Sequence, residues 1–256
     1  MKLILGQLKA AFFQLFATPK HRTILIVFVL LAALVSVSEL AIAKLFGHII
    51  LAEETLPKSQ LIIYIGSFLL LFIVVRTAHF VQRIYRVNVF DNAFKETNLE
   101  LKKRKMLWRW KLAFELTTIL SKLTSLVVVV VFLTILNWRF GIINIIVIVV
   151  ILQIFGRLFK KQLKVQRKFV KARIEKMHVP HAIRFGARIR SGELGNLISG
   201  IAMLILMVAL LGLGISGSIK AANTIVLFFG IRMQNSNLSA IAIGLMRFAK
   251  AKIRSV

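Results

Sequence analysis

Long apolar stretches recur along the chain and alternate with segments rich in Lys and Arg. Runs such as TILIVFVLLAALVSV and IINIIVIVVILQIF approach the roughly 20 residues with which a helix crosses about 30 Å of hydrocarbon. The pattern predicts an all-α integral membrane protein with six transmembrane helices, which cover about Thr23–Phe46, Leu61–Gln82, Leu116–Leu136, Ile142–Gly156, Leu197–Ser216 and Thr224–Phe248.

A shorter apolar stripe precedes the first of these spans. Leu5, Leu8 and Phe12 recur at helical spacing, and the sequence ATPKHR then interrupts the pattern. An amphipathic helix of this kind lies along a membrane surface. We therefore expect two parts, an interfacial N-terminal helix over residues 1–22 and a six-helix transmembrane domain over residues 23–256.

The two longest segments between spans also carry a helical pattern. Apolar residues recur at helical spacing in residues 76–115 and again in residues 157–193, with basic residues at the remaining positions. The spans are therefore expected to continue past the membrane as amphipathic helical arms. Pro180 is expected to separate the two arms of the second pair, because proline cannot sit inside a regular helix.

Composition agrees with a membrane protein, since 58% of the 256 residues are hydrophobic and the mean hydropathy is +0.83. The net charge is +27, and thirty of the 36 Lys and Arg residues lie in the termini and the two long loops. Cytoplasmic segments carry such an excess, so both termini are expected on the cytoplasmic side of a bacterial inner membrane or its equivalent. Basic residues beside membrane exits attract anionic lipids, and no nucleic-acid-binding motif accompanies them.

The order of these parts resembles the transmembrane domain of ABC exporters of the six-helix type. The shared features are the surface helix, the break at TPKHR, short outer hairpins, two long cytoplasmic hairpins, and the closing stretch SGSIKAANTIVLFFGIRMQNSNLSAIAIGLMRFAKAKIRS. The resemblance implies a half-transporter that forms a homodimer, or a heterodimer with a related subunit. Its first and sixth helices would then face a central path for substrate.

Two departures limit the resemblance. The chain contains no G-x-x-x-x-G-K-[ST] phosphate loop and ends nine residues after Arg247, where a nucleotide-binding domain would begin. No cofactor is therefore expected in this chain, and ATP would act only through a partner ATPase. The arms are also short for the family. If an ATPase docks, the resemblance assigns its contacts to the turns at the arm tips, which contain Asn92, Lys95, His178, Pro180 and His181.

Polar residues interrupt the first and sixth spans at similar depth. Counted along regular helices, Glu39 lies about 10 Å and Arg232 roughly 13 Å below the outer surface. Because an arginine near the bilayer centre costs about 2.5–3.5 kcal/mol, it should face protein or water. We therefore expect Glu39 and Arg232 to meet, by ion pair or through water, within a polar strip that also contains Ser36, Ser38, Gln234, Asn235 and Asn237.

Several alternatives stay open at this level. The strip is either a contact between helices, held by hydrogen bonds, or the lining of a transport path, or a set of side chains that reach toward the membrane surface. The protein is correspondingly a permease-like subunit or an ATPase-free structural or assembly subunit derived from the exporter fold. No catalytic arrangement of acids, Ser and His is present, and the chain has no Cys. The sequence HVPH alone is a weak metal motif.

Overall fold

The computed structural model describes residues 2–50, 57–96, 103–177 and 179–255, which form α-helices with no strand. Five of these helices are long and apolar enough to cross a membrane, namely α2 to α6, as predicted for an integral membrane protein. The helices are α1 (Lys2–Leu15), α2 (Pro19–Ile50), α3 (Lys58–Glu96), α4 (Lys103–Leu136), α5 (Trp138–Ile174), α6 (His181–Ile215) and α7 (Ala221–Ser255).

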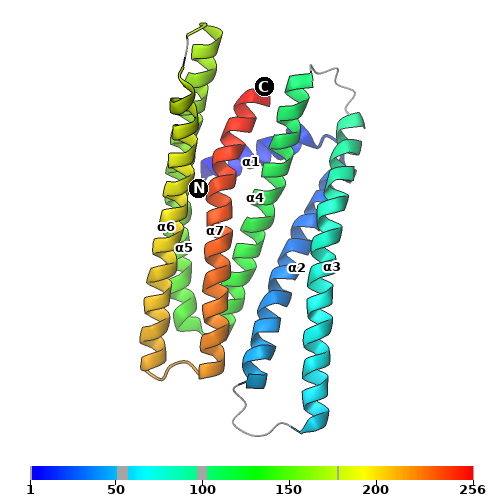
Figure 1. Cartoon of the computed structure of the whole chain (residues 1–256), viewed down its shortest axis with the longest axis vertical. Helices are drawn as coiled ribbons and strands as arrows, with labels where there is room; N and C mark the ends of the chain where they lie inside the picture. Colours follow the sequence, from blue (N-terminus) through cyan, green and yellow to red (C-terminus); the bar gives the residue numbers. More distant parts are fainter. Residues whose placement is uncertain (1, 51–56, 97–102, 178, 256) are drawn as a thin grey trace.

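Helices α2 to α7 run side by side as a bundle, and the chain reverses direction at each connection (Figure 1). The predicted spans coincide with these helices, except that Ser216 at the end of the fifth span lies just after α6. Helices α3, α4, α5 and α6 continue well beyond the predicted spans, as expected of helical arms. The α5–α6 pair extends past the other helices at the end of the bundle where the C-terminus lies (Figure 1).

Helix α7 packs against α4, α6, α2 and α5, and so lies at the centre of the bundle. It coincides with the predicted sixth span, but it does not belong to the helices that hydropathy alone marks as membrane-spanning. Its polar residues lower its hydropathy. A helix enclosed by other helices carries such residues at less cost than one that faces lipid, because protein and not hydrocarbon surrounds it.

Helix α3 lies at the edge of the bundle and packs chiefly against α2. Only 6% of the residues in its most apolar window are buried. One hydrogen bond that joins the two helices runs from Gln82 Nε2 to the backbone oxygen of Phe28, at 2.9 Å.

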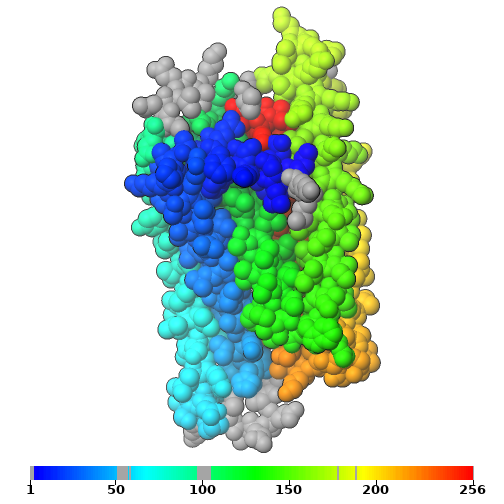
Figure 2. All heavy atoms as spheres, turned by 180° about the vertical axis from the view of Figure 1, so that it is seen from behind, coloured from blue at the N-terminus to red at the C-terminus, as the bar shows by residue number. Residues whose placement is uncertain are grey.

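The N-terminal helix α1 crosses the bundle on its outside, where Figure 2 shows it as a dark-blue band. Its apolar residues Leu8, Ala11 and Leu15 are buried against the other helices. The Lys252 ammonium of α7 donates to the backbone oxygen of Gln7 at 3.3 Å and to its side-chain oxygen at 2.5 Å. Burial of Lys252, with the nearby Arg167 as a second cause, lowers the pKa of this lysine.

The second helical hairpin turns where the sequence predicts it. Helix α5 ends at Ile174, Lys176 adopts a positive φ of 55°, and α6 begins directly after Pro180. The backbone N–H of Met177 donates to the Ala172 oxygen at 2.8 Å, which closes the end of α5. The predicted break at Pro180 is therefore confirmed.

Candidate functional site

A cavity of about 410 Å³ lies between α2, α3, α4 and α7. We call it the polar cleft, because most of the side chains that line it are polar or charged. Its lining consists of Ala32, Val35, Ser36, Glu39, His79, Gln82, Arg83, Arg86, Thr118, Ser121, Lys122, Ser125, Met233, Ser236 and Asn237.

Each helix contributes one face to the polar cleft. The lining residues of α2, α3 and α4 follow the spacing i, i+3, i+4, i+7, and those of α7 follow i, i+3, i+4. Residues at these positions share one side of a helix. One face of each helix therefore borders the same space, and the faces of α3 and α4 are polar throughout. Two of these faces were not predicted from the sequence, namely HxxQRxxR from His79 in α3 and TxxSKxxS from Thr118 in α4. Their i, i+3, i+4, i+7 spacing is the signal that could reveal them.

Charged side chains in the polar cleft come from three helices. Glu39 Oε1 of α2 lies 3.7 Å from His79 Nε2 of α3. Arg86 of α3 donates from Nη1 to the Thr118 hydroxyl of α4 at 3.4 Å, and its guanidinium lies 4.8 Å from the centre of the Phe114 ring. These contacts hold α3 against α2 and α4 on either side of the cavity.

The serines of the polar cleft connect α2 to α4. The buried Ser36 hydroxyl donates to Ser125 Oγ at 2.7 Å, and the Ser125 hydroxyl reaches the Ala32 oxygen at 3.2 Å. Ser36 thus acts as a contact between helices at the wall of the cavity. Ser38 is buried as well, and its hydroxyl donates to the backbone oxygen of Leu34 in its own helix at 3.0 Å.

The expected direct ion pair between Glu39 and Arg232 does not form among the described residues. Glu39 is paired with His79 instead, and Arg232 is exposed and belongs to none of the ion pairs among the described residues. Arg232 precedes Met233, the first lining residue of α7, by one position. One position rotates a side chain by about 100° around a helix, so equal depth does not bring the two charges together.

The remaining residues of the expected strip take different places on α7. Asn237 is buried and lines the polar cleft. Gln234 is buried outside the lining, and within the described chain its side-chain amide has no hydrogen-bond partner. Asn235 instead accepts from the Ser199 hydroxyl of α6 at its side-chain oxygen (2.6 Å) and its backbone oxygen (3.0 Å). The strip is therefore divided between a cavity lining and helix contacts.

Replacing Ser199 by alanine is expected to lower the free energy of unfolding by about 0.6 kcal/mol, up to about 1.7, the range measured for such bonds in membranes. The variant removes the hydroxyl that joins α6 to Asn235 of α7. Unfolding midpoints in detergent would measure the effect. Ser216→Ala, on the exposed end of the same segment, is the matched control, and equal shifts for the two variants would contradict a role of Ser199 in helix contact.

The turns expected to contact an ATPase lie at one end of the bundle. Asn92 and Lys95 are exposed in the last turns of α3, and Lys95 Nζ lies 2.6 Å from Asp91 Oδ2. Pro180 and His181 are exposed at the start of α6, whereas His178 lies outside the described residues. Over the described ranges, no three metal-binding side chains gather at one place.

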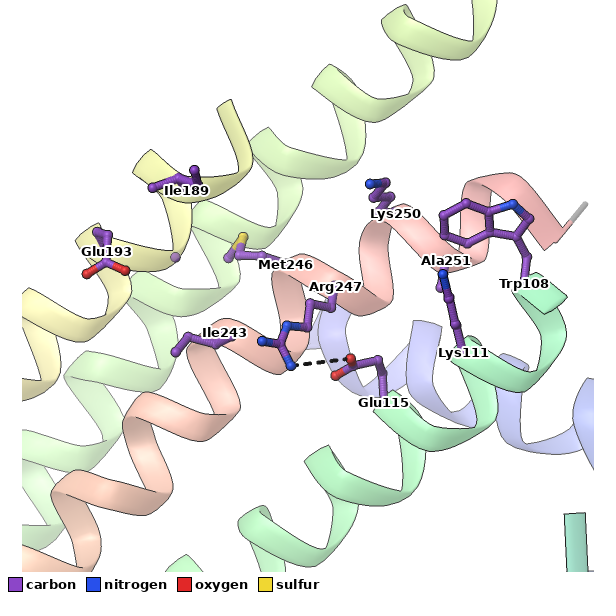
Figure 3. Close-up of a pocket in the computed structure, with 11 residues that line it drawn as sticks. Trp108, Lys111, Glu115, Ile189, Glu193, Ile243, Met246, Arg247, Lys250 and Ala251 are labelled. Atoms are coloured by element: carbon purple, nitrogen blue, oxygen red, sulfur yellow. Dashed lines mark ion pairs between the residues drawn. The ribbon is translucent and has the colours of Figure 1, made fainter. Parts of the chain in front are cut away.

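A second cavity of about 530 Å³ lies between α4, α6 and α7 (Figure 3). Arg247 Nη1 of α7 lies 3.8 Å from Glu115 Oε1 of α4, the pair joined by the dashed line in Figure 3. Trp108 lies beside it, with Lys111 Nζ at 4.8 Å and Lys250 Nζ at 5.7 Å from the ring centre. Trp and basic residues together are typical of a membrane interface.

Comparisons of the chain with protein-family models and with curated proteins find no match. The chemistry of the polar cleft is therefore the basis for a functional proposal. The cavity offers cations, hydroxyls and amides inside a bundle of apolar helices, where such groups are costly unless they pair with one another or with a polar guest. It has room for a small polar molecule.

Proposed function

We propose that this chain is a permease-like membrane subunit, in which the polar cleft forms part of a path for a polar solute. The cavity between α2, α3, α4 and α7 supports this proposal, because its charged lining lies among helices apolar enough to cross a membrane. Polar and ionisable residues in such helices face the bundle interior or a water-filled cavity, and they mark substrate pathways.

The wider proposal follows the resemblance to the six-helix ABC exporters. In it α7 is the sixth transmembrane helix, both termini are cytoplasmic, and the subunit pairs with itself or with a related chain among anionic lipids. A separately encoded ATPase would bind at the turns that contain Lys95 and His181 and supply ATP hydrolysis. The chain itself would be neither an enzyme nor a holder of a cofactor.

The second candidate function is that of an ATPase-free structural or assembly subunit in a larger membrane complex. Two hydrogen bonds favour it, because Ser36 to Ser125 and Ser199 to Asn235 use parts of the expected strip to join helices. The two candidates differ in whether water reaches the polar cleft. A transport path is open to water at some stage, whereas a purely structural contact stays dry.

Thiol labelling tests this difference directly, because the chain has no Cys and each introduced thiol is the only one present. We expect Ser121→Cys, in the polar cleft, to react with a membrane-impermeant maleimide in lipid nanodiscs, which leave both faces accessible. The matched control is Val127→Cys on the same helix, whose side chain is 60% exposed on the outer surface of the bundle and would face lipid.

We expect the thiol at Ser121 to react at least about tenfold faster than the thiol at Val127, because a thiol in hydrocarbon stays protonated and the thiolate is the reactive form. Equal and slow reaction at both positions would contradict a water-filled path and favour the structural subunit.

A further inference from the structure

We infer that the polar cleft selects anions, so that the solute moved by this subunit carries a carboxylate, phosphate or sulfonate group. This inference rests on the proposed function and names the class of its substrate. Two independent features of the cavity lead to it, namely the balance of charge in its lining and the chemical kind of its unpartnered polar atoms.

The charge of the lining is positive. Arg83 and Arg86 of α3 and Lys122 of α4 line the polar cleft, and Glu39 is the only acidic residue among the lining residues. Glu39 is already next to His79, at 3.7 Å. Three cations on two helices therefore face a space with one carboxylate, and that carboxylate already lies beside the His79 ring.

A positive cavity with apolar walls attracts anions and repels cations. Charges interact more strongly there than in water, because the surrounding protein and lipid screen them less. Such clefts raise the local concentration of the oppositely charged solute by roughly 10- to 1,000-fold. A cation would have to approach Arg86 and Lys122 without a matching array of carboxylates.

The unpartnered polar atoms of the cleft are hydrogen-bond donors. The side chain of Asn237 is 2% exposed, and its amide nitrogen has no acceptor among the described residues. The buried Nε of Arg86 likewise lacks an acceptor there. A buried donor without an acceptor costs about 1–3 kcal/mol. Both residues line the polar cleft, so a rotation of either side chain would bring its donor to the oxygens of a bound anion.

The test compares an anionic and a cationic reagent of similar size at one thiol. Sulfonatoethyl methanethiosulfonate and trimethylammonioethyl methanethiosulfonate would be reacted with Ser121→Cys in phosphatidylcholine nanodiscs, which carry no net lipid charge. The ratio of the two rates is divided by the ratio at Ser216→Cys, an exposed position between α6 and α7. This division removes the intrinsic reactivity of the reagents.

We expect the normalised ratio to favour the anionic reagent by about tenfold or more. Adding Lys122→Gln or Arg86→Gln should bring it back toward one, and adding Glu39→Gln should raise it. The two cation variants lie on different helices, so the test survives if one of them fails to fold.

The outcomes separate the inference from the proposed function. Reaction with both reagents at a normalised ratio near one would overturn anion selection and leave the water-filled path in place. If the anionic reagent still reacts faster in both Lys122→Gln and Arg86→Gln, its preference comes from the charge of the whole chain. That result would also overturn the inference. No reaction with either reagent at Ser121→Cys, while Ser216→Cys reacts, would overturn the path and the inference together.

Discussion

Replacing Phe90 by alanine is expected to lower the free energy of unfolding by about 3–5 kcal/mol. Phe90 of α3 is fully buried where α1, α3 and α4 meet. Its ring centre lies within 5.1–6.4 Å of four other aromatic rings, those of Phe16, Phe94, Trp110 and Phe114. The truncation removes these contacts and leaves a cavity that rigid neighbouring rings fill poorly.

Phe80→Ala is the matched control, because Phe80 lies on the same helix and is 66% exposed. Its truncation should change the free energy of unfolding by no more than about 0.5 kcal/mol. Thermal or denaturant unfolding of both variants in the same detergent would measure the difference. Similar losses at the two positions would show that the aromatic cluster does not fasten α3 to α1 and α4.

Replacing Gly195 by alanine is expected to destabilise the contact between α6 and α7. A Cβ atom at Gly195 would lie 2.6 Å from the Cβ atom of Ala242. A methyl group cannot rotate out of the way, so the two helices would have to move apart. Overpacking of this kind costs about 1–3 kcal/mol, against a gain of about 1 kcal/mol from the better helix propensity of alanine.

Gly200→Ala provides the control on the same helix. A Cβ atom there meets nothing within 4 Å, so this variant should be neutral or more stable by up to about 1 kcal/mol. The sequence segment GNLISG contains both glycines and predicts close helix approach without saying which glycine is responsible. If Gly195→Ala proved as stable as Gly200→Ala, the close approach of α6 and α7 would be refuted.

The helices follow from the sequence more directly than the site does. Hydropathy locates the spans, and Pro180 marks the end of an arm, because both are properties of a local segment. Helix α7 is the difficult case. Its Gln234 and Asn237 argue against a span when counted alone, and only the surrounding α2, α4, α5 and α6 explain how the bundle accommodates these two buried amides.

The candidate site was predicted in part. Counting residues along a helix gives depth, and it selects Ser36, Glu39 and Asn237, which all line the polar cleft. Depth does not give the direction in which a side chain points, and it therefore predicts a direct ion pair between Arg232 and Glu39 that the described residues do not form. The contributions of α3 and α4 depend on which helices become neighbours, and local periodicity does not determine that.

The edge position of α3 has a consequence for how the protein comes apart. Regions with few buried contacts open locally before a protein unfolds as a whole. Only 6% of the most apolar window of α3 is buried, whereas the end of the helix is held by the aromatic cluster at Phe90. Because α3 supplies His79, Gln82, Arg83 and Arg86, its partial release would remove one wall of the polar cleft while α4 to α7 remain folded. The melting temperature measured from helix content would then be higher than the temperature at which the polar cleft loses its solute. Amide hydrogen exchange measured for each helix would test this, because the amides of α3 should exchange before those of α4 to α7.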